Sequence, residues 1–299
     1  MEIRNLYTFL QVASTLNITQ ASEVLGYSQS NVSMQIQQLE SELGIRLFDR
    51  VGRGIALTHY GEDLIPYAQQ VVSAIYQLQH SMLSESEITG TLRIGIVESV
   101  FAVCFKTLIQ KFNRRFPKVR IDVTVDGTTT LQKLLVKNEI DVACLIDSPL
   151  TNTKLIDKYS HMVDIVLVAN INHPLAKKEH ISFTELASHH FILMENTAPY
   201  NVLFQQQLVA ADVKIEPFLT LQSCDMARIL VEDDNYISLL PIYSVKKSIL
   251  ENRIAVLPVE KFSIQQHVQI AISKQKFITP QIDGFIQTAS EVFDDILSI

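Results

Sequence analysis

The stretch from Thr19 to Leu43 constrains the fold most, because it reads as two short amphipathic helices joined by a tight turn. Thr19 is a good N-cap for the first helix, Gly26 interrupts its pattern, and Ser28 can cap the second helix. The second helix has an apolar stripe at spacings of four, three and four, formed by Val32, Ile36, Leu39 and Leu43. This stripe would hold the second helix against the first.

The opposite face of the second helix is mostly polar. At about 100° per residue, it carries hydroxyl and amide groups and one thioether: Ser30, Met34, Gln37 and Ser41, flanked by Ser33 and Gln38. A helix of this kind suits the major groove of DNA, where base edges present hydrogen-bond donors and acceptors. The alternative is an ordinary surface helix of a helical bundle.

A small hairpin, or wing, is expected after these helices. Gly52, Arg53 and Gly54 form a turn between two short apolar runs. The two glycines would let the turn lie close to a phosphate backbone, and Arg53 at its tip could enter a minor groove.

Residues 1 to 61 resemble the winged helix-turn-helix domain of LysR-type transcriptional regulators. The resemblance is carried by residues in a fixed order: Phe9, Ala13, Ala21, Ser28, Gln29, Ser33, Gln35, Ile36, Leu39, Glu40, Leu43, Gly44, Leu47, Phe48, Arg50, Gly52, Arg53, Leu57 and Thr58. It implies a bacterial regulator that binds double-stranded promoter DNA as a homodimer or homotetramer, responds to a small effector and engages RNA polymerase. The residues expected to contact DNA are Thr19, Ser28, Gln29, Ser30, Ser33, Met34, Gln37, Arg50 and Arg53.

The reading face departs from the family pattern at two positions. Ser30 stands where the family usually has proline, and Met34 stands where it often has arginine. Met34 cannot bond guanine in a bidentate manner but could pack on a thymine methyl group. We therefore expect an A·T-leaning binding site.

Charge and composition limit the kind of protein further. The formal net charge of −7 argues against a generic polyanion binder, and up to Thr58 there are four arginines against five acidic residues. Since few cations release few counterions, tight DNA binding should need several protomers. No apolar run reaches the roughly 20 residues of a membrane helix, and no secretory signal opens the chain, so we expect a cytoplasmic protein. The scattered Cys104, Cys144 and Cys224 are expected to be buried, reduced thiols.

A long helix is expected between Tyr60 and Glu87, which contains Pro66 near its start and no glycine after Gly61. It carries a sustained apolar stripe of Leu64, Ala68, Val71, Val72, Ile75, Leu78 and Met82. A long striped helix without a globular body of its own is a candidate coiled-coil seam, and in the family such a linker helix pairs with its partner. The alternative is a helix packed within its own chain.

From residue 90 onward, strands alternate with helices, which predicts a parallel sheet with right-handed crossovers. This region resembles the effector-binding part of the same family, which has the two-lobed fold of periplasmic solute-binding proteins. The expected fold class is α/β, with a helix-rich winged helix-turn-helix at the N-terminus. The expected domains are the DNA-binding domain at 1–58, the linker and hinge at 59–89, and the effector domain at 90–299. Within the effector domain, lobe I is expected at 91–162 and 267–299, and lobe II at 163–266.

Candidate effector-binding residues follow strands at the points where helices begin. Ser99, Thr128 and Thr129 lie at the carboxyl ends of parallel strands, where open α/β sheets place ligands. Their hydroxyls and the nearby amides could hold an anion, although ordinary N-capping explains the same residues. By family resemblance, Asn196, Thr197 and Tyr200 would face them from the second lobe. We expect a small, organic anion as effector.

Other functions receive less support from the sequence. His180, His189 and His190 lack the acidic or cysteine partners of a metal site, so no metal or cofactor is expected. There is no phosphate loop, nucleophile elbow or paired-carboxylate motif, so an enzyme on the same two-lobed fold is not favoured. A solute-binding or transport protein is the other alternative, and the N-terminal domain argues against it.

Overall fold

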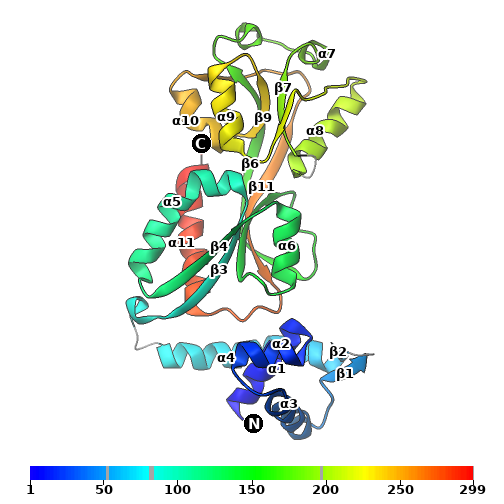
Figure 1. The fold of residues 1–299 in the computed structure, drawn as a ribbon, viewed down its shortest axis with the longest axis vertical. Coiled ribbons are helices and arrows are strands. Elements are labelled where there is room, and N and C mark those ends of the chain that lie inside the picture. Colours follow the sequence, from blue (N-terminus) through cyan, green and yellow to red (C-terminus); the bar gives the residue numbers. More distant parts are fainter. Residues whose placement is uncertain (52–53, 81–83, 196–197, 299) are drawn as a thin grey trace.

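The computed structural model describes residues 1–51, 54–80, 84–195 and 198–298. It has a small N-terminal domain and two α/β lobes arranged along the long axis of the molecule (Figure 1). The expected fold class is therefore confirmed.

The N-terminal domain is built from three helices and a hairpin. Its elements are α1 (Ile3–Thr15), α2 (Ile18–Leu25), α3 (Gln29–Leu43), β1 (Phe48–Val51) and β2 (Gly54–Leu57). Phe9, Val12 and Leu39 are fully buried in its core, together with Val32 of the predicted stripe. These apolar side chains hold the helices together, because their burial removes apolar surface from water.

The caps of α2 and α3 were predicted with mixed success. Ser28 caps α3 as expected, since its side chain accepts a hydrogen bond from the backbone N–H of Asn31 at 3.2 Å. The prediction for α2 was wrong, because Asn17 caps it by accepting from Gln20 N, and Thr19 is an exposed residue of the first turn. Gly26 ends α2 with a φ of +68°, a left-handed conformation that favours glycine.

The long helix α4 (His59–His80) packs on its own domain along one face. Ile65, Ala68 and Val72 are buried in the same core as α1 and α3. Gly61 lets the start of α4 lie against Leu47, because a Cβ at this position would overlap the carbonyl oxygen of Leu47. The alternative of packing within the chain thus holds for one face of α4. Met82 of the expected stripe lies outside the described residues.

The remaining residues form one nine-stranded sheet, in the order β4-β3-β5-β11-β6-β9-β7-β8 with β10 paired to β6. The strands are β3 (Gly90–Ile96), β4 (Val119–Val125), β5 (Val142–Asp147), β6 (Leu155–Asn170), β7 (Phe191–Met194), β8 (Leu219–Leu221), β9 (Ile237–Pro241), β10 (Ile254–Val256) and β11 (Ile264–Ser273). Its helices are α5 (Glu98–Arg115), α6 (Thr128–Val136), α7 (Phe183–Leu186), α8 (Pro199–Ala210), α9 (Cys224–Asp233), α10 (Ile242–Leu250) and α11 (Pro280–Leu297), with short 3-10 turns at Glu85–Glu87 and Pro174–Lys177.

The predicted parallel pairing is present at both ends of this sheet, in β4-β3-β5 and in β8-β7-β9. Between them, β6 and β11 run antiparallel, from the pair Ile264–Ile165 to the pair Ser273–Leu155, and pass from one lobe into the other (Figure 1). The two lobes therefore share a backbone hydrogen-bond ladder, which has one register shift between Ile270 and Ala271.

All three cysteines are unpaired and buried, as expected. Burial raises the pKa of the Cys104 and Cys224 thiols to about 12, so these thiols are unreactive at neutral pH. Within the described residues, no helix is long and apolar enough to span a membrane.

Candidate nucleic-acid interface and interlobe cleft

The outer face of α3 is polar and accessible, as its sequence predicted. Ser30, Gln37 and Gln38 are exposed, Met34 is 59% exposed, and Ser33 is half-buried. Gln29 and Ser41 are exposed as well. The stripe on the other side differs at its end, since Leu43, the last residue of α3, is 37% exposed.

A hollow of about 520 Å³ lies between α3 and the wing. It brings together Ser33 and Gln37 from α3 with Arg50 from β1. Arg50 is exposed and is paired in the hairpin with Ile55. The expected wing-tip residue Arg53 lies outside the described residues. Two of the predicted contact types, amide and guanidinium, thus line one concave surface.

Glu40 fixes the wing to α3. Its Oε1 accepts hydrogen bonds from the backbone N–H groups of Leu47 at 2.7 Å and Phe48 at 3.2 Å. After β2, the hydroxyl of Thr58 donates a hydrogen bond to the carbonyl of Arg46 at 2.7 Å. Glu40 was noted as part of the family pattern, but its structural role was not predicted. These hydrogen bonds set the distance between α3 and the wing.

The second hollow is the interlobe cleft, of about 500 Å³, which is lined by residues 97–99, 125–128, 146, 194–195, 198–200 and 222–224. Three predicted effector residues line it, namely Ser99, Thr128 and Tyr200. Thr129 does not line it and is exposed instead. Asn196 and Thr197 lie outside the described residues.

Each predicted hydroxyl in the cleft already has a partner in the protein. Ser99 Oγ lies 2.8 Å from the hydroxyl of Tyr243, and Thr128 Oγ1 donates to the carbonyl of Ile146 at 2.9 Å. The Tyr200 hydroxyl lies 3.4 Å from Cys224 Sγ. Burial raises the pKa of Tyr200 and Tyr243 well above the ordinary value, so both phenols remain protonated.

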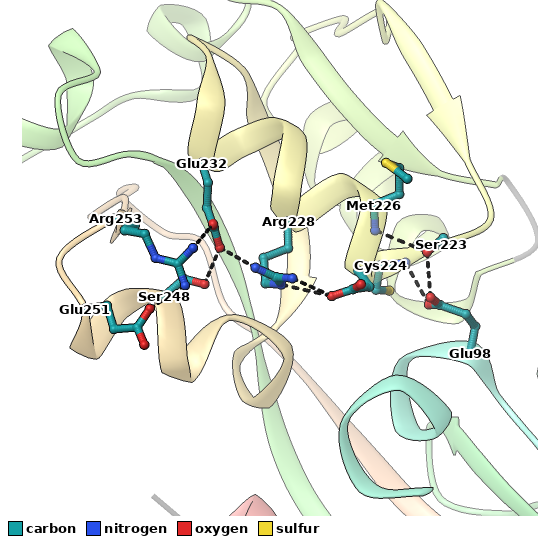
Figure 2. A network of polar contacts seen from close by, with 10 residues as sticks. Glu98, Ser223, Cys224, Met226, Arg228, Glu232, Ser248, Glu251 and Arg253 are labelled. Carbon is teal, nitrogen blue, oxygen red and sulfur yellow. Dashed lines mark hydrogen bonds and ion pairs between the residues drawn. The ribbon is translucent and has the colours of Figure 1, made fainter. Parts of the chain in front are cut away.

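Glu98 spans the cleft from lobe I to lobe II (Figure 2). Its carboxylate accepts hydrogen bonds from the Ser223 hydroxyl at 2.6 Å and from the backbone N–H of Cys224 at 2.7 Å. The carboxylate therefore occupies the positive N-terminal end of α9, where an anionic ligand would otherwise be stabilised. The sequence analysis missed this residue, although its position directly after a strand could have drawn attention to it.

The cleft lining is acidic. Besides Glu98 it contains Asp126 and Glu195, and among the described lining residues none is Lys, Arg or His. Asp126 accepts from the backbone N–H of Gly127 at 2.7 Å, and Glu195 accepts from Gln222. The amides that could receive a small anion here are thus partly taken by the chain's own carboxylates.

Two family models match the chain. The model for the "Bacterial regulatory helix-turn-helix protein, lysR family" matches residues 3–62, and the model for the "LysR substrate binding domain" matches residues 85–294. The chain belongs to the LysR family. This is a family of transcriptional regulators rather than of enzymes. For metals, the described part of this LysR protein contains no group of three or more His, Cys, Asp or Glu that could hold an ion.

Relatives support the same assignment over the full length. YwqM of Bacillus subtilis (strain 168), an uncharacterized HTH-type transcriptional regulator, is 27% identical, with 98% of this chain and 100% of YwqM covered. A full-length OxyR variant from Pseudomonas aeruginosa is 21% identical, with a TM-score of 0.58 and coverage of 97% and 94%. The CcmR regulatory domain of Synechocystis PCC6803 in complex with 2-PG is 20% identical, with a TM-score of 0.60 and coverage of 68% and 97%. These two structures share the fold of this LysR protein.

Proposed function

We propose that this LysR protein regulates transcription by binding promoter DNA through the outer face of α3 and the wing. The observation that carries the proposal is the polar face of α3, which opens onto the same hollow as Arg50. The proposed contacts are those expected from the sequence, Thr19, Ser28, Gln29, Ser30, Ser33, Met34, Gln37, Arg50 and Arg53. The exposed thioether of Met34 supports an A·T-leaning site, since it could contact thymine methyl groups.

A gel shift tests this function directly. The protein should retard DNA taken from upstream of its own gene and leave a coding fragment of equal length and base composition unretarded. Failure to retard any upstream fragment would contradict promoter binding.

We further propose that the protein acts in the cytoplasm and engages RNA polymerase there. The proposed domain and lobe boundaries are those expected from the sequence, after residues 58, 89, 162 and 266.

We propose that the protein binds DNA as an oligomer through the second face of α4. Tyr60, Tyr67, Val71 and Leu78 are 56%, 66%, 41% and 73% exposed. Their separations of seven, four and seven residues place them on one coiled-coil seam. Because the N-terminal domain has few cations, a single copy of α3 should bind DNA weakly. A dimer that presents two copies of α3 would bind the same DNA more tightly.

A charge in this seam should weaken self-association. Val71→Glu is expected to raise the dimer dissociation constant by at least about tenfold, because the paired helices would bury an unpaired carboxylate. Sedimentation equilibrium measures the change. The matched control is Val256→Glu on β10, where the valine is also 41% exposed. Equal association of the two variants would exclude α4 as the dimer seam.

We propose that a small effector binds in the interlobe cleft and changes the relation between the lobes. The CcmR regulatory domain was solved in complex with 2-PG, which supports ligand binding by this fold. The expected negative charge of the effector is not favoured here, because three carboxylates and no cation line the described cleft. A ligand with ammonium or hydroxyl groups suits this lining better.

A thermal-shift screen on the full protein tests the charge preference. Amino acids, polyamines and sugars should raise the melting temperature more than organic acids do, and Glu98→Gln should remove the stabilisation by cations. Glu291→Gln, at an exposed position of α11, is the matched control. If organic acids stabilise the protein, and do so more strongly after Glu98→Gln, the cleft takes anions and the revised charge is wrong.

A further inference from the structure

Polar contacts join the two lobes on the side where α5 meets α9 and α10. Glu98, the first residue of α5, bonds the start of α9. The hydroxyl of Ser99, the next residue, lies 2.8 Å from that of Tyr243 on α10, and both residues are buried. Lys246 of α10 donates to the carbonyl of Ser298, just after α11, at 2.8 Å. The lobes are therefore held together here by side chains as well as by the crossing strands.

Glu98 binds lobe II with both of its carboxylate oxygens. Oε1 accepts from the Ser223 hydroxyl at 2.6 Å, and Oε2 accepts from the backbone N–H of Cys224 at 2.7 Å. Ser223 is also the N-cap of α9, because its hydroxyl oxygen accepts from the backbone N–H of Met226 at 3.2 Å. Both donors lie at the positive end of α9, so they bind a carboxylate group through charge-assisted hydrogen bonds.

A second carboxylate ties α9 to α10 (Figure 2). Glu232, near the end of α9, has a side chain that is 8% exposed. It bonds Arg228 one turn earlier in α9, and it also bonds Ser248 of α10 and Arg253 after α10. Arg228 in turn donates to Asp225 in the first turn of α9 at 2.6 Å. Because these charge-assisted bonds meet at one poorly hydrated group, α9 and α10 are expected to move as one unit.

These contacts form a closed ring through both lobes. The ring runs from Glu98 into α9, along α9 to Glu232, across to α10, and back through Tyr243 to Ser99, the neighbour of Glu98 in α5. Because the bonds of such a network strengthen and orient one another, the loss of one contact weakens the rest. Every group in the ring belongs to the chain itself, so the ring holds the lobes by internal contacts.

We propose that Glu98 is a built-in carboxylate ligand of lobe II that latches the two lobes together without the help of an effector. A small organic acid in the cleft would have to displace Glu98 from the Ser223 and Cys224 donors. An effector whose ammonium or hydroxyl groups bond Glu98 would instead draw the carboxylate away from α9 and release the latch. This mode of release rests on the proposed effector cleft, whereas the latch itself does not.

Chemical rescue of the full-length protein tests the latch with acetate as the probe. Glu98→Ala should lower the melting temperature by about 3–6 °C, because it removes charge-assisted hydrogen bonds. Sodium acetate should restore part of this loss, compared with sodium chloride at equal ionic strength, because acetate can fill the vacated space and accept from the same donors. Glu98→Gln fills the space without the charge, so acetate should not stabilise it more than the wild type.

Glu216→Ala is the matched control for the rescue. It removes an exposed carboxylate of lobe II that bonds Lys214 within the same lobe. Acetate should therefore stabilise this variant no more than it stabilises the wild type. If acetate stabilises Glu98→Ala no more than Glu216→Ala, the donors on α9 do not form a carboxylate site and the proposal is overturned.

A distance between the lobes provides a readout that a merely local loss of stability would not change. Spin labels at Lys106→Cys on α5 and Lys247→Cys on α10 report it, because both positions are exposed and the native cysteines are buried. Glu98→Ala should lengthen or broaden the distance, and acetate should reverse the change. Tyr243→Phe should do the same without altering the carboxylate, since it breaks the other interlobe bond of the ring.

An unchanged label distance in both variants would overturn the latch. This result is distinguishable from a failure of the proposed effector site, because neither measurement uses an effector. A screen in which no amine, sugar or organic acid stabilises the wild type would remove the effector and leave the latch standing.

Discussion

A Gln37→Glu protein is expected to lose about 100-fold in affinity for its promoter fragment while folding as the wild type does. Gln37 is exposed in the hollow between α3 and the wing, so the change costs little stability. The glutamate cannot donate to base acceptors and is repelled by phosphates. Since one good base contact is worth about 1–3 kcal/mol and a dimer loses it twice, the loss reaches this size.

Quantitative gel shifts at constant salt measure the effect, because protein–DNA affinity depends steeply on ionic strength. The control is Gln206→Glu, which makes the same chemical change at an exposed position of α8 in lobe II. Equal loss in both proteins would mean that added negative charge acts from a distance. No loss in either would mean that Gln37 lies away from DNA.

Asp141→Ala is expected to lower the free energy of unfolding by about 3–5 kcal/mol, because it leaves a buried ammonium without its carboxylate. The side chains of Asp141 and Lys276 are 8% and 10% exposed. Arg93 is 38% exposed, so solvent screens its share of the interaction. Urea unfolding followed by circular dichroism measures the change.

An exposed ion pair supplies the control for this experiment. Asp122→Ala removes the partner of Arg120, in a pair whose side chains are 47% and 76% exposed. Its effect should stay below about 1 kcal/mol. A similar loss in both variants would show that the Asp141 cluster is no more important for stability than a surface pair.

The Asp141 cluster should also make stability depend on pH in the acid range. Burial acts to raise the pKa of Asp141, but the bonds from Arg93 and Lys276 outweigh it and hold the pKa below its usual 3.8. A carboxyl group with a depressed folded-state pKa stabilises the fold above its unfolded pKa and loses this contribution as pH falls through the folded value. The difference between wild type and Asp141→Ala should therefore shrink below about pH 4.

The sequence pattern of α3 predicted correctly which of its central side chains are buried and which are exposed. The period of 3.6 residues placed Val32 and Leu39 inside and Gln37 outside, as the structure has them. The pattern could not show where the covering surface ends, so Leu43 was wrongly placed inside. Asn17 and Thr19 are both capable caps, and only the packing of α2 decides between them.

The interlobe cleft depends on contacts between residues that are far apart in the sequence. Glu98 contacts Ser223 and Cys224 at sequence separations of 125 and 126 residues, and no periodicity couples such positions. The expected anion site at Ser99 assumed free hydroxyls and amides, whereas the folded chain supplies Tyr243 and Glu98 as partners.

The crossing strands determine what kind of motion the lobes can make. Because β6 and β11 remain hydrogen-bonded along the crossing, the lobes cannot swing as if joined by loose loops. The ribbon has one register shift, between Ile270 and Ala271, and an irregularity of this kind increases the local twist of the strands. The 274–279 segment follows β11 and contacts Gln69 of α4. Lobe I thus contacts the linker helix α4 directly, through a segment that follows the crossing strand β11.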